Sequence, residues 1–87
     1  MEIIDILKRN CIITDSIVKG LNGEDRKYFQ HDSGVYFIYN GKLNLCDAAI
    51  INETQPIEIN IITTFENSRI LLKFISCLRE NVELNES

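Results

Sequence analysis

The sequence predicts an α+β fold: an N-terminal helical segment, a four-stranded antiparallel β-meander and a C-terminal amphipathic helix packed on the sheet. Three observations predict this class. Apolar residues recur at helical spacing near both ends of the chain, they alternate with a period of two in the middle, and turn-forming residues interrupt that middle part. A chain of 87 residues can enclose one hydrophobic core, so residues 1–87 are predicted to form one domain.

The first segment, residues 1–21, carries an apolar stripe that repeats at about 100° per residue. Several isoleucines lie off this stripe, which indicates two helices with a break near Asn10. Thr14 or Asp15 would cap the second helix, and the glycine-containing run at 20–23 would end it.

Residues 27–63 are predicted to form the meander, because strand-forming residues alternate there between turn signals. The four strands are expected at residues 27–31, 35–39, 43–51 and 57–63. Asn40 and Gly41 accept positive φ at little cost, so they predict a two-residue type I′ turn. Asp32 to Gly34 suit a three-residue hairpin loop with Gly34 in the left-handed conformation.

Residues 66–82 return to helical spacing. Their apolar stripe comprises Ile70, Leu71, Phe74, Ile75, Leu78 and Val82. Thr63 and Glu66 have the spacing of a capping box, and Asn67 is the alternative N-cap. Residues 83–87 are polar and acidic, so we expect a frayed tail there.

The predicted turns also assign side chains to the two faces of the sheet. The first, which we call the aliphatic face, is expected to lie under the C-terminal helix; it comprises Tyr36, Ile38, Leu43, Leu45, Ala49, Ile51, Ile57, Ile59 and Ile61. The second, which we call the mixed face, comprises Phe29, Val35, Phe37, Tyr39, Cys46, Ala48, Ile50 and Ile62, interspersed with Lys42, Asn44, Glu58 and Asn60. The solvent side of an antiparallel sheet is usually more polar than this mixed face.

Three explanations of the mixed face stay open. The N-terminal helix covers it, a partner or a second copy of the chain binds to it, or a β-bulge changes the register. If a partner binds there, Phe29, Phe37 and Tyr39 are the aromatic anchors, because such side chains carry much of the binding energy of interfaces. Lys42 and Glu58 would then lie at the rim.

Asp47 falls in the middle of a strand on the aliphatic face, where an unpaired carboxylate would be costly to bury. The alternatives are a bulge at Cys46 and Asp47 that turns the side chain outward, a paired buried acid, or a functional acid. Together with Glu24, Asp25 and Asp32, Asp47 is also a candidate acidic contact for a partner.

Composition excludes several classes of protein. The net charge is −4 and the isoelectric point is about 4.8, which argues against binding that depends on phosphate contacts. The longest apolar runs span four or five residues, far fewer than the roughly 20 of a membrane span, and the N-terminus does not resemble a secretory signal. We therefore expect a cytoplasmic protein, in the producing cell or in a host cell.

No motif in the sequence predicts catalysis, a metal or a cofactor. The three cysteines are widely spaced, and the single histidine, His31, lacks the paired ligands of a zinc site. His31 and Cys46 fall on the same face, but an intervening strand position separates them, so a catalytic dyad is not expected. The four glycines are all explained by turns rather than by a phosphate loop.

The sequence therefore favours a non-enzymatic, small acidic protein-binding module, an inhibitor or regulator that docks on a larger protein or nucleoprotein, or on a second copy of itself. Its small size, its acidity and its fifteen isoleucines and nine asparagines are typical of phage-borne or mobile-element antagonists of host nucleoprotein enzymes. The alternative is a nucleic-acid-binding or small-ligand-binding domain that uses the aromatic residues of the mixed face.

Overall fold

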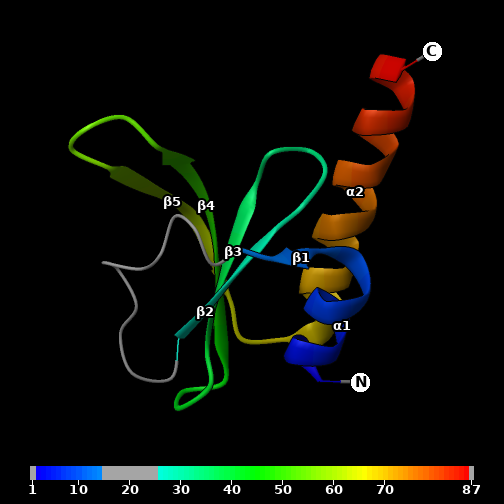
Figure 1. The fold of residues 1–87 in the computed structure, drawn as a ribbon. Helices are drawn as coiled ribbons and strands as arrows, with labels where there is room; N and C mark the ends of the chain where they lie inside the picture. The colour runs from blue at the N-terminus through cyan, green and yellow to red at the C-terminus, as the bar shows by residue number, and fades with distance from the viewer. Residues whose placement is uncertain (1, 15–25, 87) are drawn as a thin grey trace.

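The computed structural model describes residues 2–14 and 26–86, and it has the predicted α+β architecture with an antiparallel sheet (Figure 1). Its elements are α1 (Ile3–Asn10), β1 (Ile12–Ile13), β2 (Arg26–Gln30), β3 (Tyr36–Asn40), β4 (Leu45–Asn52), β5 (Glu58–Phe65) and α2 (Ser68–Glu86). The strands follow one another in the order β1-β2-β3-β4-β5, and every neighbouring pair is antiparallel. The described sheet therefore has five strands where four were predicted.

The additional strand comes from the segment that was expected to be helical. Helix α1 ends at Asn10, as the break in the apolar stripe predicted, and the Asn10 side-chain amide donates a hydrogen bond to the Ile6 carbonyl at 2.7 Å. Ile12 and Ile13 then pair with β2, and their β-branched side chains favour this extended backbone. Thr14 donates its N–H to the Tyr28 carbonyl instead of capping a second helix, and residues 15–21 of that prediction lie outside the described part of the chain.

The loop between β2 and β3 has the predicted three-residue form. The His31 N–H bonds to the Val35 carbonyl at 2.9 Å, and Gly34 has a φ of 95°. Glycine adopts this left-handed conformation without the steric cost that a side chain would add.

The loop between β3 and β4 differs from the prediction. Asn40 pairs with Leu45, so four residues connect the strands, and positive φ occurs at Asn44 (54°) rather than at Asn40 and Gly41. The Asn40 side chain stabilises this wider turn because its Oδ1 accepts the N–H groups of Lys42 and Leu43, at 3.1 and 3.2 Å. Tyr39 consequently pairs with Cys46 instead of Lys42, and because this shift is even, each side chain of β3 and β4 keeps its predicted face.

A register shift between β4 and β5 has a larger effect. It lies between Ala48 and Ala49, where Ala48 pairs with Thr63 and Ala49 pairs with Ile61, so Ile62 is the extra residue of a bulge in β5. The bulge predicted at Cys46 and Asp47 therefore lies elsewhere. Beyond it the faces of β5 exchange, which places Phe65 on the mixed face, opposite Cys46.

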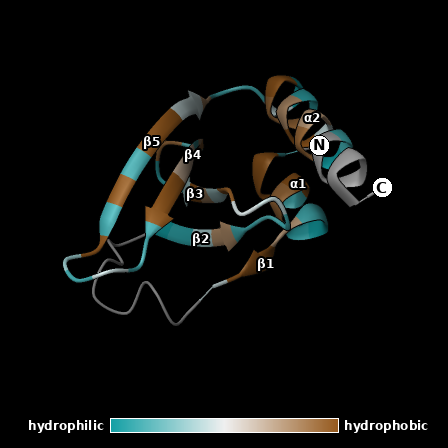
Figure 2. Cartoon of the chain, turned by 90° about the horizontal axis from the view of Figure 1, so that it is seen from above, coloured by the Kyte–Doolittle hydropathy of each residue, from teal (hydrophilic) through white to brown (hydrophobic). Residues whose placement is uncertain are grey.

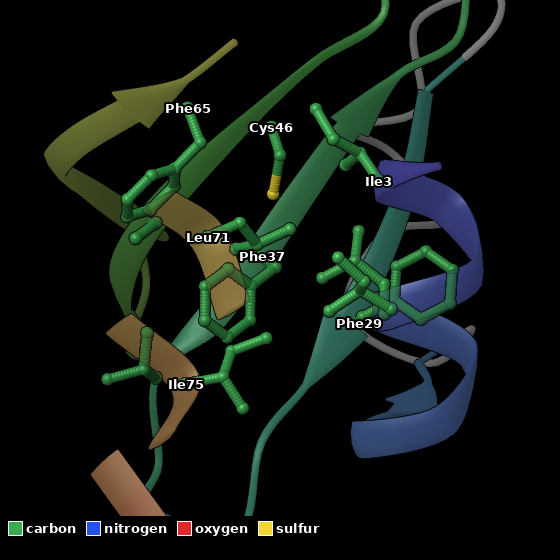
Figure 3. Packing of buried hydrophobic residues seen from close by; sticks show 11 residues of the cluster. Ile3, Phe29, Phe37, Cys46, Phe65, Leu71 and Ile75 are labelled. Carbon is green, nitrogen blue, oxygen red and sulfur yellow. The ribbon is translucent and has the colours of Figure 1, made fainter. Parts of the chain in front are cut away.

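Both helices cover the mixed face, so the expected assignment of the core was wrong (Figure 2). The main core joins α1 and α2 to this face through Ile3, Ile6, Leu7, Phe29, Val35, Phe37, Cys46, Ala48, Phe65, Leu71 and Ile75 (Figure 3). Cys46 and Ala48 contribute small side chains to this cluster, and Leu71 and Ile75 of α2 lie beside Phe37 (Figure 3).

The aliphatic face forms a second cluster to which no described helix residue belongs. It comprises Tyr28, Tyr36, Ile38, Ala49 and Ile51, with Ile57 and Ile59 partly buried against them. The sheet thus has an apolar cluster on each side, and only one of them is covered by the described helices.

Helix α2 begins after Asn67, whose Oδ1 accepts the Arg69 N–H at 2.8 Å, which confirms the alternative cap. Thr63, the other candidate, belongs to β5. The helix continues to Glu86, so most of the expected tail of residues 83–87 has helical backbone.

Candidate protein-interaction surface

The aromatic anchors predicted from the sequence lie inside the protein. Phe29 and Phe37 pair across β2 and β3, and both have an exposed fraction of 0% beneath the helices. Tyr39 is half-buried, packs against the same core, and donates its hydroxyl hydrogen to Asn44 Oδ1 at 3.2 Å. These three residues therefore do not form a free binding face, which corrects both the partner-surface hypothesis and the stacking-platform alternative.

The predicted rim residues are exposed but far apart. Lys42 lies in the loop that precedes β4, whereas Glu58 pairs with Asn52 at the other end of that strand. Because β4 is eight residues long, about 26 Å of strand separates the two positions. The structure does not bring Lys42 and Glu58 into one site.

The candidate acidic contacts are likewise dispersed. Asp47 is half-buried on the aliphatic face, and its Oδ1 accepts a hydrogen bond from the Thr64 hydroxyl, so it is a partnered structural acid. Asp32 is exposed in the loop between β2 and β3. Glu24 and Asp25 lie outside the described residues.

The most unusual surface is the edge of the sheet formed by β5 (Figures 1 and 2). The strand is eight residues long, as long as β4, and no described strand pairs with its outer edge. Most of its residues are exposed, and Ile61 and Ile62 each expose 51% of their surface. An edge strand presents unpaired N–H and C=O groups, so this one combines free hydrogen-bonding capacity with exposed isoleucines.

Proteins usually protect such edges with proline, lysine, shortness or a bulge. Between Ile59 and Phe65, β5 contains no proline and no charged residue, and within the strand the bulge at Ile62 is the one such protective feature. The composition of the strand, rich in isoleucine and threonine, has high β propensity. The edge is therefore suited to pairing with another extended chain.

An open hollow adjoins the C-terminal end of this edge. It has a volume of about 290 Å³ and is lined by Thr64, Phe65, Glu66, Asn67 and Ile70. Ile70 exposes 57% of its surface on the first turns of α2. The hollow therefore provides a partly apolar site, lined also by polar residues, at the end of the strand.

Burial disfavours the charged forms of two cysteine thiols and of His31 in the described part of the chain. Burial, with a smaller contribution from the Asp32 carboxylate, raises the pKa of the Cys11 thiol to about 12. Burial also raises the pKa of Cys46 to about 12, with smaller contributions from Asp47 and Cys11. Thiols with such pKa values are protonated at neutral pH, and a protonated thiol is a poor nucleophile.

His31 is buried in the loop between β2 and β3, at an exposed fraction of 6%, whereas the sequence predicts it as the last residue of a strand. Its Nδ1 accepts the Ser33 N–H at 3.1 Å and lies 2.9 Å from the Ser33 hydroxyl. Burial lowers the pKa of His31; Asp32 opposes this shift and Arg79 adds to it. Within residues 2–14 and 26–86, no three histidine, cysteine or acidic side chains are grouped so that they could hold a metal ion.

Comparison with known proteins gives no relative: no family model, no curated protein and no solved structure matches this chain. Among the described helices, none combines the length and the apolar character that crossing a membrane requires.

Sequence reasoning missed the β5 edge although a signal was present. A meander places its last strand at an edge, and the residues from Ile59 to Phe65 include neither lysine nor proline. Ile59 and Ile61 were instead assigned to the core because their spacing matches a buried face. Spacing reports which side chains share a face, whereas exposure at an edge depends on what lies beside the strand.

Proposed function

We propose that this protein is a non-enzymatic binding module that recruits an extended segment of a larger partner protein to the β5 edge, and that it inhibits or regulates that partner. The observation that supports this proposal most directly is the eight-residue β5, an edge strand with half-exposed Ile61 and Ile62. In this binding mode, main-chain hydrogen bonds supply affinity, and pockets for alternate side chains supply specificity.

Three features of the described residues fit this mode. The strand is anchored to β4 along its inner edge, so it offers a preorganised template. The hollow between Thr64 and Ile70 can receive one side chain of the incoming segment. Cys46 and His31 are buried, Cys11 is half-buried, and the raised thiol pKa values keep both cysteines protonated, which suits a module that acts by binding.

The test compares capture of binding proteins by the wild-type protein and by edge variants. We expect Ile61→Lys and Ile62→Lys to abolish capture of the partner, because each places a charge at the centre of the edge. Leu43→Lys is the matched control, since Leu43 is 62% exposed in the loop between β3 and β4 and lies away from β5. Thermal unfolding of all three variants checks that the fold is retained.

Hydrogen exchange gives an independent readout. The backbone amides of residues 58–65 should become protected when the captured partner is added, because its strand would occupy their free hydrogen-bonding groups. Capture that survives both edge substitutions, without protection of this segment, would refute the proposed function.

A further inference from the structure

Two carboxylates mark the ends of the β5 edge. Glu58 is the first residue of the strand and Glu66 follows its last residue, and both side chains are exposed. Because Ile62 is the extra residue of a bulge, about seven extended steps, or roughly 23 Å, separate them. Neither forms an ion pair within the described residues, and the residues between them carry no charge.

This arrangement disfavours a second copy of the chain as the occupant of the edge. In an antiparallel pairing centred on Ile61, Glu58 of one copy lies opposite Thr64 of the other copy and two positions from its Glu66. When the pairing is centred between Ile61 and Ile62, Glu58 of one copy lies opposite Phe65 of the other copy, one position from its Glu66. An in-register parallel pairing places each glutamate beside its own equivalent, so each of these three self-pairings brings acid close to acid at both ends. Such charges lie within or close to a Debye length of about 8 Å, so salt only partly screens their repulsion.

The same two carboxylates complement a different kind of strand. From the proposed function, we infer that the β5 edge selects an extended segment with a neutral, apolar middle and a lysine or arginine near each end. The cation at one end faces Glu58, the cation at the other faces Glu66, and the apolar middle covers Ile61 and Ile62. The net charge of −4 favours the approach of such a basic segment.

The hollow beside Glu66 refines this specificity. Thr64, Phe65 and Ile70 offer it apolar surface, and Glu66 and Asn67 offer it acceptors. Arg69 and Lys73 of α2 are exposed, but neither lines the hollow. An apolar side chain followed by a basic residue therefore fits this end of the edge.

Labelled synthetic peptides test the inference. Three eight-residue peptides, one residue shorter than the span 58–66 because Ile62 is the extra residue of the bulge, share one valine- and threonine-rich middle and differ at their ends, which carry two lysines, two glutamines or two glutamates. We expect the lysine-ended peptide to bind about 3- to 10-fold more tightly than the glutamine-ended one, and the glutamate-ended peptide to bind most weakly. The difference should shrink between about 50 and about 500 mM salt.

Variants in which glutamate is replaced by glutamine show which carboxylates cause the tighter binding of the lysine-ended peptide. The Glu58→Gln, Glu66→Gln double variant should erase the advantage of the lysine ends. The control is Glu2→Gln with Glu80→Gln, which makes the same change of net charge at exposed positions outside β5 and should leave the advantage intact. Ile62→Lys should weaken binding of all three peptides, because it disrupts the edge itself.

The outcomes separate this inference from the proposed function. If all three peptides bind equally and Ile62→Lys abolishes binding, the edge is a docking site but the selection by charge is wrong. If none binds, both are wrong. A wild-type dimer in sedimentation that Ile62→Lys converts to monomer would also overturn the inference, because a second copy would then occupy the edge.

Discussion

The rings of Phe37 and Phe74 meet edge to face, with their centroids 6.0 Å apart and their planes at 86°. Phe74 also lies 5.2 Å from Phe65, between centroids, at a tilted angle. These contacts join the middle strand and the edge strand of the sheet to α2. They fix the mixed face as the interior of the protein, and they remove Phe37 from any free binding surface.

Phe37→Ala should therefore destabilise the protein instead of weakening the binding of a partner. Removing a fully buried phenylalanine costs about 3–5 kcal/mol, a large part of the stability of a small domain. The measurement is the free energy of unfolding in urea, with Leu43→Ala at an exposed position as the control. A stable, cooperatively folded Phe37→Ala variant would show that the helices do not cover this face.

A double-mutant cycle on Phe37 and Phe74 tests the contact between the two rings. Aromatic pairs contribute about 0.5–1.5 kcal/mol beyond the area that they bury. The free energies of unfolding of Phe37→Leu, Phe74→Leu and the double variant should show a coupling of this size. Additive effects of the two substitutions would mean that the rings do not interact.

Features of the fold that depend on neighbouring residues could be predicted from the sequence, whereas those that depend on distant contacts could not. The end of α1 near Asn10, the loop with Gly34, the four predicted strands and the Asn67 cap depend on neighbouring residues, and the sequence alone predicts them. Whether α2 covers the mixed or the aliphatic face depends on the bulge at Ile62, which turns Phe65 toward the helix. Period-two spacing identifies two faces but not which one the helix covers, so the predicted anchors were wrong although their shared face was right.

The turn between β3 and β4 yields a prediction at Asn44, whose φ of 54° suits glycine or asparagine. Asn44→Gly and Asn44→Val both lose the hydrogen bond from the Tyr39 hydroxyl. The valine variant alone adds a β-branched side chain at positive φ, so it should be less stable than the glycine variant by about 1–3 kcal/mol. Urea unfolding of both variants measures this difference.

Gly41→Ala is the complementary change in the same turn. Positive φ among the described glycines occurs at Gly34, so an alanine at Gly41 should change the free energy of unfolding by less than about 0.5 kcal/mol. If Gly41→Ala lost much stability and Asn44→Val lost little, the structure of this turn would be wrong and the two-residue turn predicted from the sequence would be right.

The three cysteines should differ sharply in reactivity. Cys77 is exposed, whereas Cys11 is half-buried, Cys46 is buried, and both of these thiols have pKa values of about 12. A thiol-specific reagent at neutral pH should modify one thiol quickly in the folded protein and all three in denaturant. Cys77→Ser should remove the fast phase of thiol modification in the folded protein. Rapid modification of Cys46 in the folded protein would contradict its place in the core.

The last prediction concerns acid stability and follows from His31. Its Nδ1 accepts the Ser33 N–H, so the ring is neutral in the folded protein, and burial lowers its pKa below the usual 6.5. The unfolded chain therefore binds the proton more readily than the folded one. The stability that His31 contributes should be complete above about pH 6.5 and should decline as the pH falls through and below this value, by at most about 1.4 kcal/mol per pH unit.

Unfolding free energies of the wild type and of His31→Asn between about pH 8 and about pH 5.5 measure this contribution, because asparagine can accept the Ser33 N–H but does not titrate. Asp32→Asn provides a second, directional test. The Asp32 carboxylate raises the pKa of His31, so its removal should lower that pKa further and make the acid-induced loss of stability larger. If the wild type gains stability relative to His31→Asn as the pH falls, His31 is protonated in the folded protein and its hydrogen bond to Ser33 must be reassigned.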